Sequence, residues 1–256
     1  MVHNMMKFKR NFPAAKQRGF SLLELLLVIA ILSLIVGAVF SQMGDAQRRL
    51  NAEETKLGDF QEARDFVDQF FRDINQAGSP NIRMYDPTLF GASPMNDSRL
   101  AVGLVSIDNN SITFEGSVNG TGTVQSITYK INGSGGTTCP LCLQRSQVDK
   151  ANNTSPTAQG TDWGTEINDI TNTTTFPIFK YYQYDGTQIT SLPQDISTAA
   201  GANIIANVKT IQINLTIRNP NIIDQKTGQP IETSFEGEVS LNNCSMASAG
   251  QAMSCQ

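Results

Sequence analysis

The chain has 256 residues, of which 39% are hydrophobic and 16% are charged. This length allows one or two domains with a substantial core, and the composition argues against a polytopic membrane protein. The single histidine, His3, leaves little basis for a catalytic histidine or an imidazole metal site. Five basic residues and no acid precede Phe20, so the remainder carries 14 basic and 23 acidic residues, which disfavours non-specific binding of nucleic acid.

The first element in chain order is an apolar run. From Leu25 to Gly44 the sequence has 20 consecutive residues without a charge. As a helix this run measures about 30 Å, the thickness of the hydrocarbon core of a bilayer. The run therefore predicts a membrane-spanning helix, with a buried helix of a soluble protein as the alternative. The basic residues before it predict a cytoplasmic N-terminus and an exported remainder.

The residues around the start of this run differ from those of a secretory signal. Such a signal places a small-residue cleavage site after its apolar region, whereas here Gly19 stands before it. One acid, Glu24, falls near the start of the apolar helix. A carboxylate costs up to about 2.5–3.5 kcal/mol at the centre of a bilayer and less near its surface. Such a group usually has a partner, which makes Glu24 a candidate functional residue.

The stretch Arg18-Gly19-Phe20-Ser21-Leu22-Leu23-Glu24-Leu25-Leu26 resembles the prepilin processing motif of type IV pilins and type II secretion pseudopilins. The resemblance covers only the N-terminal part of the chain. It implies cleavage between Gly19 and Phe20 by a prepilin peptidase and N-methylation of the new Phe20 amine. It also implies that the apolar helix survives processing and becomes the element through which subunits assemble.

Glu24 acquires a specific role under this resemblance. When apolar helices pack together in a filament, its carboxylate can pair with the Phe20 ammonium of a neighbouring subunit. The pair offsets the desolvation of both charges and fixes the axial register of the two helices. The alternative is a glutamate at the membrane interface without a partner.

The helix is predicted to continue beyond the membrane, because no proline interrupts the chain between Pro13 and Pro80. Apolar residues recur there at helical spacing, which predicts one buried face rather than a coiled coil. The end is expected near Ala77-Gly78-Ser79-Pro80. The apolar positions are Ala46, Leu50, Leu57, Phe60, Val67, Phe71 and Ile74.

The remainder of the chain is predicted to form strands, because its apolar positions alternate with a period of two. We expect an antiparallel sheet packed on the helix, and therefore an α+β fold of pilin type. The expected domains are a cleaved leader (1–19), a membrane and assembly helix (20–44), its amphipathic continuation (45–77) and an exported head (78–256). The predicted strands are Leu100–Ile107, Ser111–Glu115, Ser126–Ile131, a strand with Ile178, Lys180, Tyr182 and Tyr184 on one face, Val208–Arg218, and a last strand with Phe235, Gly237, Val239 and Leu241.

Residues 144–175 lack a clear period and are rich in Asn, Thr, Ser, Gly and Asp. We expect this segment to be a surface insertion of the head or a mobile segment. It contains Trp163, the only tryptophan of the chain. A local anchoring role for this side chain is favoured over a binding platform.

All four cysteines lie in the exported part, where an oxidising compartment favours disulfides. Proximity in the sequence favours Cys139–Cys142 and Cys244–Cys255 among the three pairings. The second loop resembles the C-terminal disulfide loop of many pilins. A Cys-x-x-Cys redox site at Cys139 and Cys142 and a four-cysteine zinc site are the disfavoured alternatives.

The sequence offers no catalytic residue, cofactor motif or metal-ligand cluster. Calcium is found in some pseudopilins, and Asp108-Asn109-Asn110 with Asp162 would be the residues to help bind it. Their spacing matches no known calcium loop, so an ordinary turn is favoured.

The head and its polar segment resemble those of PilW-type minor pilins and J-type minor pseudopilins. The resemblance implies a non-enzymatic subunit that helps initiate or cap a type IV pilus or a type II secretion pseudopilus. Its partners would be other pilin or pseudopilin subunits, a prepilin peptidase and the inner membrane, with the head in the periplasm or outside the cell and no nucleic acid or cofactor bound.

Two other functions stay open. One is a tip adhesin or DNA-uptake module that uses residues 144–175, with Lys130, Arg145 and Lys150 as the few candidate basic contacts. The other is a membrane-anchored thiol oxidoreductase that uses Cys139 and Cys142.

Overall fold

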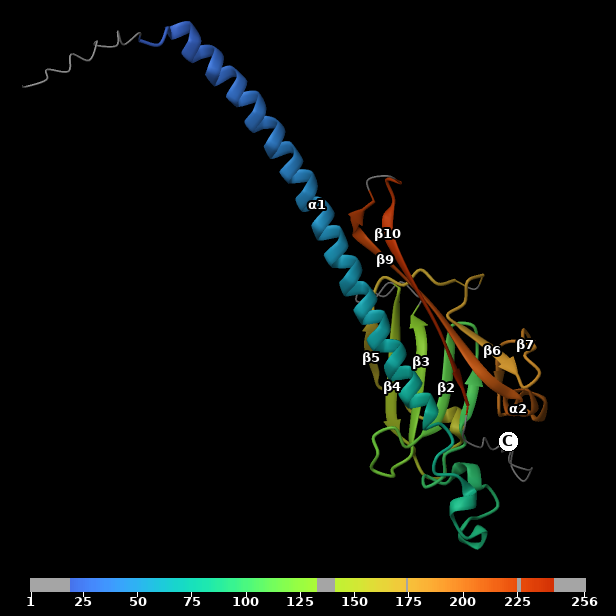
Figure 1. The fold of residues 1–256 in the computed structure, drawn as a ribbon. Coiled ribbons are helices and arrows are strands. Elements are labelled where there is room, and N and C mark those ends of the chain that lie inside the picture. Colours follow the sequence, from blue (N-terminus) through green and yellow to red (C-terminus); the bar gives the residue numbers. More distant parts are fainter. Residues whose placement is uncertain (1–18, 133–140, 174, 225–226, 242–256) are drawn as a thin grey trace, which may run out of the picture. The chain divides into compact units, whose positions relative to one another are not determined.

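The computed structural model describes residues 19–132, 141–173, 175–224 and 227–241. The chain divides into two compact units, one that ends at Asn51 and one that begins at Ala52. The 54-residue helix α1, Leu22–Asn75, begins in the first unit and ends in the second (Figure 1). An unbroken helix of this length agrees with the absence of proline between Pro13 and Pro80.

In the first unit, α1 packs against nothing else in the described chain. Every side chain from Leu22 to Phe40 is exposed, although most of them are Leu, Ile, Val or Ala. The hydroxyl of Ser33 donates to the carbonyl oxygen of Ile29 at 2.8 Å, which satisfies this polar group within the helix. Such a helix keeps its own backbone bonded and leaves its apolar surface available to another environment.

In the second unit, one face of α1 packs against the head. The buried face starts later than the sequence predicted, because Ala46 is exposed and the side chains of Leu50 and Leu57 are 68% and 63% exposed. Helical spacing identifies a face but not the point at which a sheet begins to cover it. The buried side chains are Ala63, Phe66, Val67, Phe70, Asp73 and Ile74.

The helix ends as predicted, at the glycine before Pro80. Gly78 has a φ of 76°, a conformation that glycine adopts without the strain of a Cβ atom. Its backbone N–H donates to the carbonyl oxygen of Glu115 at 2.8 Å. The end of α1 is thereby tied to a strand of the head, and the chain continues through three short 3-10 helices, η1 Ile82–Met84, η2 Pro87–Leu89 and η3 Pro94–Asn96.

The first sheet has six antiparallel strands in the order β5-β4-β3-β2-β1-β8. The predicted hairpin around Asp108–Asn110 and the strand that follows it are confirmed as β1, β2 and β3. The strands are β1 Leu104–Ile107, β2 Ser111–Gly116, β3 Gln125–Asn132, β4 Cys142–Asp149, β5 Trp163–Ile167 and β8 Gln194–Asp195.

The second sheet has four antiparallel strands in the order β10-β9-β6-β7. The sequence predicted one sheet, and its strands instead divide between two. A short helix, α2 Ala199–Ala206, precedes β9. The strands are β6 Phe179–Gln183, β7 Gln188–Ile189, β9 Val208–Ile223 and β10 Pro230–Ser240.

Two strands of the second sheet show where alternation succeeds and where it fails. In β9 the predicted inward residues Ile211, Ile213, Leu215 and Ile217 are all buried. Around β6 the predicted set is only partly right, because Ile178 is buried but within the strand Phe179 and Tyr181, rather than Lys180 and Tyr182, are the buried side chains. The hydroxyl of Tyr181 donates to the carbonyl oxygen of Asp108 at 2.9 Å, so this polar group is satisfied inside the head.

Residues 144–175 are not an irregular insertion, contrary to the prediction. They contain most of β4, the whole of β5 and the 3-10 helix η4, Pro156–Ala158. Ile167 and Ile170 belong to the buried core, as does Leu143 just before the segment. β5 is an edge strand of the first sheet, and its mostly polar composition reflects the exposure of its first three side chains.

The core of the head lies where α1 meets both sheets (Figure 1). The ring of Phe70 on α1 lies 5.2 Å from that of Tyr129 on β3 and 5.6 Å from that of Phe179 on β6, between centroids. On β10, a Cβ atom at Gly237 would lie 2.9 Å from the ring of Phe71, so glycine permits the close approach of helix and strand. One helix therefore joins two sheets into one core.

Candidate assembly site and the polar contacts of the head

The backbone around Gly19 and Phe20 precedes the regular helix. Residues 19–21 have no regular secondary structure, and the first helical bonds run from the N–H groups of Glu24 and Leu25 to the carbonyl oxygen of Ser21, at 2.9 and 3.1 Å. The side chain of Phe20 is 81% exposed. The peptide bond between Gly19 and Phe20 therefore lies outside the hydrogen-bonded helix and is accessible to an enzyme.

Glu24 lies in the first turn of α1. A carboxylate at this position interacts favourably with the positive end of the helix dipole. Its side chain is exposed, and none of the ion pairs in the described part of the chain includes it. The charge of Glu24 is thus free to meet a cation from outside the chain.

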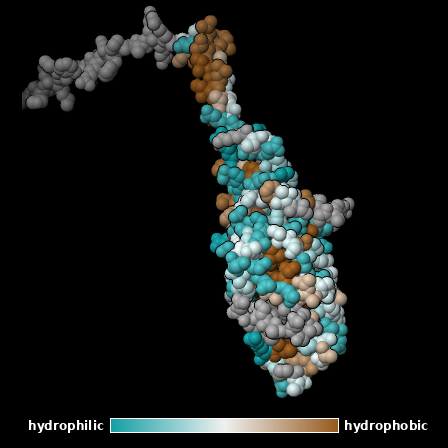
Figure 2. Space-filling model, turned by 90° about the vertical axis from the view of Figure 1, so that its right-hand side faces the viewer, coloured by the Kyte–Doolittle hydropathy of each residue, from teal (hydrophilic) through white to brown (hydrophobic). Residues whose placement is uncertain are grey.

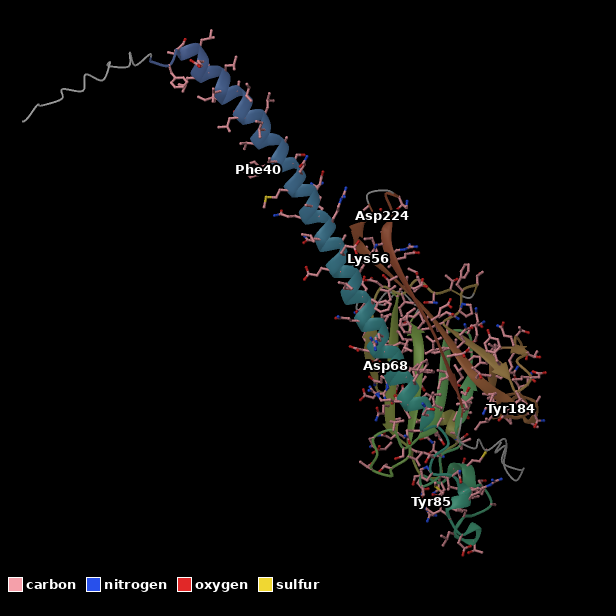
Figure 3. All side chains as sticks on the ribbon, in the orientation of Figure 1. Phe40, Lys56, Asp68, Tyr85, Tyr184 and Asp224 are labelled. Atoms are coloured by element: carbon pink, nitrogen blue, oxygen red, sulfur yellow. The ribbon has the colours of Figure 1, made fainter. Side chains whose placement is uncertain are left out.

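A continuous apolar surface follows Glu24. Within the described residues, α1 is the one helix that is long and apolar enough to cross a bilayer. Figure 2 shows this part of α1 as a hydrophobic surface, and in Figure 3 its side chains, Phe40 among them, project outward around the helix. Leu25, Leu26, Leu32 and Ile35 are each more than half exposed. An apolar surface of this extent indicates contact with a membrane or with other protein chains.

Comparison with protein families identifies the same region. Residues 14–40 match the model of the prokaryotic N-terminal methylation motif, and this match includes Gly19, Phe20 and Glu24. The chain carries a pilin-type N-terminal motif. Comparisons with curated proteins and with solved structures give no match. The motif supports the type IV pilin and pseudopilin class, whose members are typically structural, and it implies processing by a prepilin peptidase and assembly with other pilin subunits. The motif and the apolar helix together fit a membrane-anchored pilin.

In the head, a buried cluster of polar side chains joins α1 to the first sheet. Arg145 on β4 donates from Nη2 to Oδ2 of Asp73 on α1 at 2.7 Å, and the hydroxyl of Tyr129 donates to the same oxygen at 2.7 Å. The Nε of Arg145 lies 2.9 Å from the hydroxyl oxygen of Tyr129. Burial, followed by the nearby charge of Asp73, raises the pKa of Tyr129 and keeps it neutral. The cluster fixes the position of α1 on the sheet.

A second buried ion pair, between Glu115 on β2 and Lys150, holds the segment 79–102. Both side chains are fully buried, and Lys150 Nζ lies 2.7 Å from Oε2 of Glu115. The same ammonium group donates to the carbonyl oxygens of Met95 and Leu100, at 2.6 and 2.8 Å, so its three protons all have acceptors. Oε2 of Glu115 also accepts from the backbone N–H of Val102 at 3.1 Å.

These contacts show how the three basic residues proposed as candidate DNA contacts are used in the head. Arg145 and Lys150 are each paired with a buried carboxylate. Lys130 is exposed, and its Nζ lies 4.9 Å from the centroid of the Trp163 ring. The three residues therefore form no open basic patch on the described head.

Trp163 is the first residue of edge strand β5 and is 36% exposed. Its ring packs against the ammonium group of Lys130 on β3. This contact joins two strands of the first sheet and agrees with a local anchoring role for the tryptophan.

Of the four cysteines, only Cys142 falls within the described residues. It is the first residue of β4, is 1% exposed and is not a free thiol. Cys139, Cys244 and Cys255 lie outside the described residues, so the pairings Cys139–Cys142 and Cys244–Cys255 stay predictions. A redox cysteine is partly exposed and typically lies at the N-terminus of a helix, which is not the setting of Cys142.

The candidate calcium residues serve as turn residues. The N–H of Asp108 donates to the carbonyl oxygen of Ser111 at 2.9 Å, and Oδ1 of Asp108 accepts from the N–H of Asn109 at 2.8 Å. Asp162 donates its backbone N–H to the hydroxyl of Ser146. Within the described residues, no three His, Cys, Asp or Glu side chains are grouped as a metal site would need.

Proposed function

We propose that this protein is a minor pilin or minor pseudopilin, a structural subunit that helps initiate or cap assembly of a type IV pilus or a type II secretion pseudopilus. The observation that carries the proposal is the exposed apolar half of α1, which directly follows the motif at Gly19, Phe20 and Glu24. This surface is unfavourable in water at about 25 cal/mol per Å². It is accommodated first by the bilayer and then by the helices of neighbouring subunits.

Processing sets the start of the mature chain in this proposal. A prepilin peptidase on the cytoplasmic side cleaves between Gly19 and Phe20, and the new amine of Phe20 is methylated. The leader removed in this step contains the five basic residues before Phe20 and the only histidine. The peptide bond between Gly19 and Phe20 lies before the helix begins at Leu22, and its accessibility supports this step. The head lies in the periplasm or outside the cell, while the helix stays in the inner membrane until assembly.

Pairing of Glu24 with the Phe20 ammonium of a neighbouring subunit provides the axial register of assembly. Phe20 and Glu24 are both exposed residues, and Glu24 has no ion-pair partner in the described part of its own chain. Between packed apolar helices each charge needs the other, because an unpaired charge in a low-dielectric setting is strongly unfavourable.

A minor rather than a major role is supported by α1 itself. Many major pilins carry a helix-kinking proline in the apolar half of this helix, and α1 contains none. The large head is also the feature by which the sequence resembles PilW-type minor pilins and J-type minor pseudopilins, and this resemblance supports the same proposal.

The variant Glu24→Ala tests the assembly role. We expect membrane insertion to be unchanged, because the apolar run from Leu25 to Gly44 is intact, and incorporation into sheared filaments to fall. Cell fractionation and immunoblotting measure both quantities. Glu53→Ala, at an exposed position of α1 beyond the apolar run, is the matched control and should leave incorporation unchanged. Unchanged incorporation of Glu24→Ala would contradict the role.

A further inference from the structure

The face of the first sheet that points away from α1 carries a polar groove. In β3, Ile127 and Tyr129 are buried on the side of α1, so the alternation of a strand directs Ser126 and Thr128 to the opposite side. The segment 150–162, which follows β4, leaves a groove of about 290 Å³ between itself and the strands. It is called the hydroxyl groove below, because six hydroxyl side chains line it: Ser106, Thr113, Ser126, Thr128, Thr157 and Thr161.

The floor of the hydroxyl groove is a row of polar side chains fixed by the strand register. Thr128 on β3 is paired in register with Thr113 on β2, and Thr113 with Ser106 on β1. Ser106 is paired in turn with Asp195 on β8, which also lines the groove. Neighbouring strands lie about 4.8 Å apart, so polar groups repeat at about this interval across the floor. The sheet therefore presents hydroxyl and carboxylate oxygens as a fixed array.

The segment 150–162 is held in place by its own hydrogen bonds. Oε1 of Gln159 accepts from the backbone N–H of Ala151 at 2.8 Å, and Nε2 of Gln159 donates to the carbonyl oxygen of Thr154 at 3.1 Å. At the end of the segment, the backbone N–H of Asp162 donates to the hydroxyl of Ser146 on β4 at 2.8 Å. The wall of the hydroxyl groove is thus preformed, and a ligand that binds there does not have to order it.

One side chain of the floor is deeply buried and has no partner. Ser126 is only 4% exposed, it lines the hydroxyl groove, and its hydroxyl makes no hydrogen bond to a described residue. The hydroxyls of Ser106 and Thr161, which line the groove as well, also make none within the described chain. A buried polar group is normally hydrogen-bonded, because leaving it unpaired is unfavourable. Ser126 therefore points to a hydrogen-bonding group that comes from outside the chain.

The side chains that line the hydroxyl groove select among classes of ligand. None of them is basic, which disfavours a phosphate or another anion. The apolar side chains among them, Val105 and Pro156, are both buried, which disfavours a lipid tail. A hydroxyl group both donates and accepts, so a row of hydroxyls pairs best with a ligand that carries several hydroxyls itself. Asp195 adds a carboxylate, which accepts hydroxyl protons and repels anions.

We propose that the hydroxyl groove binds a neutral sugar, with the hydroxyls of Ser126 and Thr128 and the carboxylate of Asp195 as its contacts. The volume is at the lower end of the range for small-molecule sites, so one sugar ring rather than a long chain fits inside. The inference goes beyond the proposed function, because assembly through α1 does not need the groove. It gives part of the segment 144–175 a role in a binding site, by which a filament attaches to a surface that carries glycans.

Saturation-transfer-difference NMR with the full chain tests the site. The chain is solubilised in a detergent without a sugar headgroup, and glucose, galactose, mannose and N-acetylglucosamine are the probes. We expect saturation transfer to at least one of them. Its dissociation constant should rise about tenfold in Ser126→Ala and in Thr128→Val, because each variant loses one hydrogen bond to the bound sugar. The 6-phosphate of the same sugar should bind more weakly, because the groove has a carboxylate and no cation.

Thr216→Val on β9 is the matched control and should leave the dissociation constant unchanged. Thr216 also belongs to a cross-strand hydroxyl pair, with Ser234, but it lies outside the groove. Thermal unfolding verifies that each variant is folded. The inference is overturned if the unaltered chain binds none of the four sugars, if a folded Ser126→Ala or Thr128→Val variant binds as tightly as the unaltered chain, or if the 6-phosphate binds more tightly than the sugar. All variants should enter filaments as the unaltered chain does, so these outcomes leave the proposed function intact.

Discussion

Residues 22–51 of α1 expose their side chains, whereas residues 52–75 bury six of theirs against two sheets. The backbone is the same helix throughout, so the difference lies in what each part contacts. The second part finds its apolar partners, Tyr129 and Phe179 among them, within the same chain. The first part has the more apolar sequence and no such partner in the described chain. Its burial therefore has to come from a bilayer or from other subunits.

Replacement of Phe70 by alanine should have the largest effect on the packed part. Phe70 is fully buried between Tyr129 and Phe179, so Phe70→Ala removes contacts with both sheets. We expect the free energy of unfolding to fall by about 4 kcal/mol. Urea titration of the detergent-solubilised chain, followed by Trp163 fluorescence, measures it. Leu32→Ala, in the exposed part, should leave the free energy of unfolding of the head unchanged. An equal loss of this free energy in both variants would contradict the difference between the two parts of α1.

The buried ion pair of Glu115 and Lys150 should give the next largest effect. Lys150→Met leaves the carboxylate of Glu115 buried without its cation, and we expect a loss of about 3 kcal/mol. The double variant Glu115→Gln with Lys150→Met should recover most of this loss. Arg218→Met breaks the exposed pair with Glu232 and should cost less than about 1 kcal/mol. The same urea titration measures the free energy of unfolding of these variants. If Lys150→Met loses no more of it than Arg218→Met does, burial does not determine the cost of breaking an ion pair.

The pH dependence of stability gives the smallest effect. Burial raises the pKa of Glu115 above its ordinary value of 4.5, against the opposing influence of Lys150. The folded chain then binds this proton more tightly than the unfolded chain does. The contribution of Glu115 to stability therefore falls as the pH rises from about 4.5 through the raised pKa, by at most about 1.4 kcal/mol per pH unit. Unfolding titrations at a series of pH values above about 4.5, the ordinary pKa of a glutamate, should show this slope in the unaltered chain and a shallower one in Glu115→Gln. Identical slopes would exclude a raised pKa at Glu115.

The sequence predicted those parts of the fold that depend on neighbours in the chain. The alternation from Ile211 to Ile217 identified β9, and Gly78 before Pro80 identified the end of α1. The start of the buried helix face was predicted too early, because the exposed Leu50 and Leu57 continue the helical spacing beyond the edge of the head. β4 and β5 were missed because residues 144–175 are polar. Pairing rather than an apolar pattern places these strands in the sheet, β4 beside β3 and β5 beside β4.

The candidate assembly site was predictable for the same reason. Gly19, Phe20 and Glu24 are close in the sequence, so a local motif contains all of them. The buried polar contacts of the head join residues far apart, with 35 positions between Glu115 and Lys150 and 72 between Asp73 and Arg145. One signal was present, since Asp73 stands among apolar residues beside Ile74 and three positions after Phe70. A charge within an apolar helix face indicates a buried partner. The sequence does not predict that this partner is Arg145, because that depends on the register in which β4 pairs in the sheet.

The mass of the N-terminal peptide of the mature chain tests the central claim most directly. The account predicts that the chain purified from filaments begins at Phe20, carries one methyl group on its amine and retains the whole apolar run to Gly44. Peptide mass spectrometry of the purified chain determines all three properties together. A mature chain that still begins at Met1, or one that begins beyond Gly44 and has lost the helix, would contradict the account.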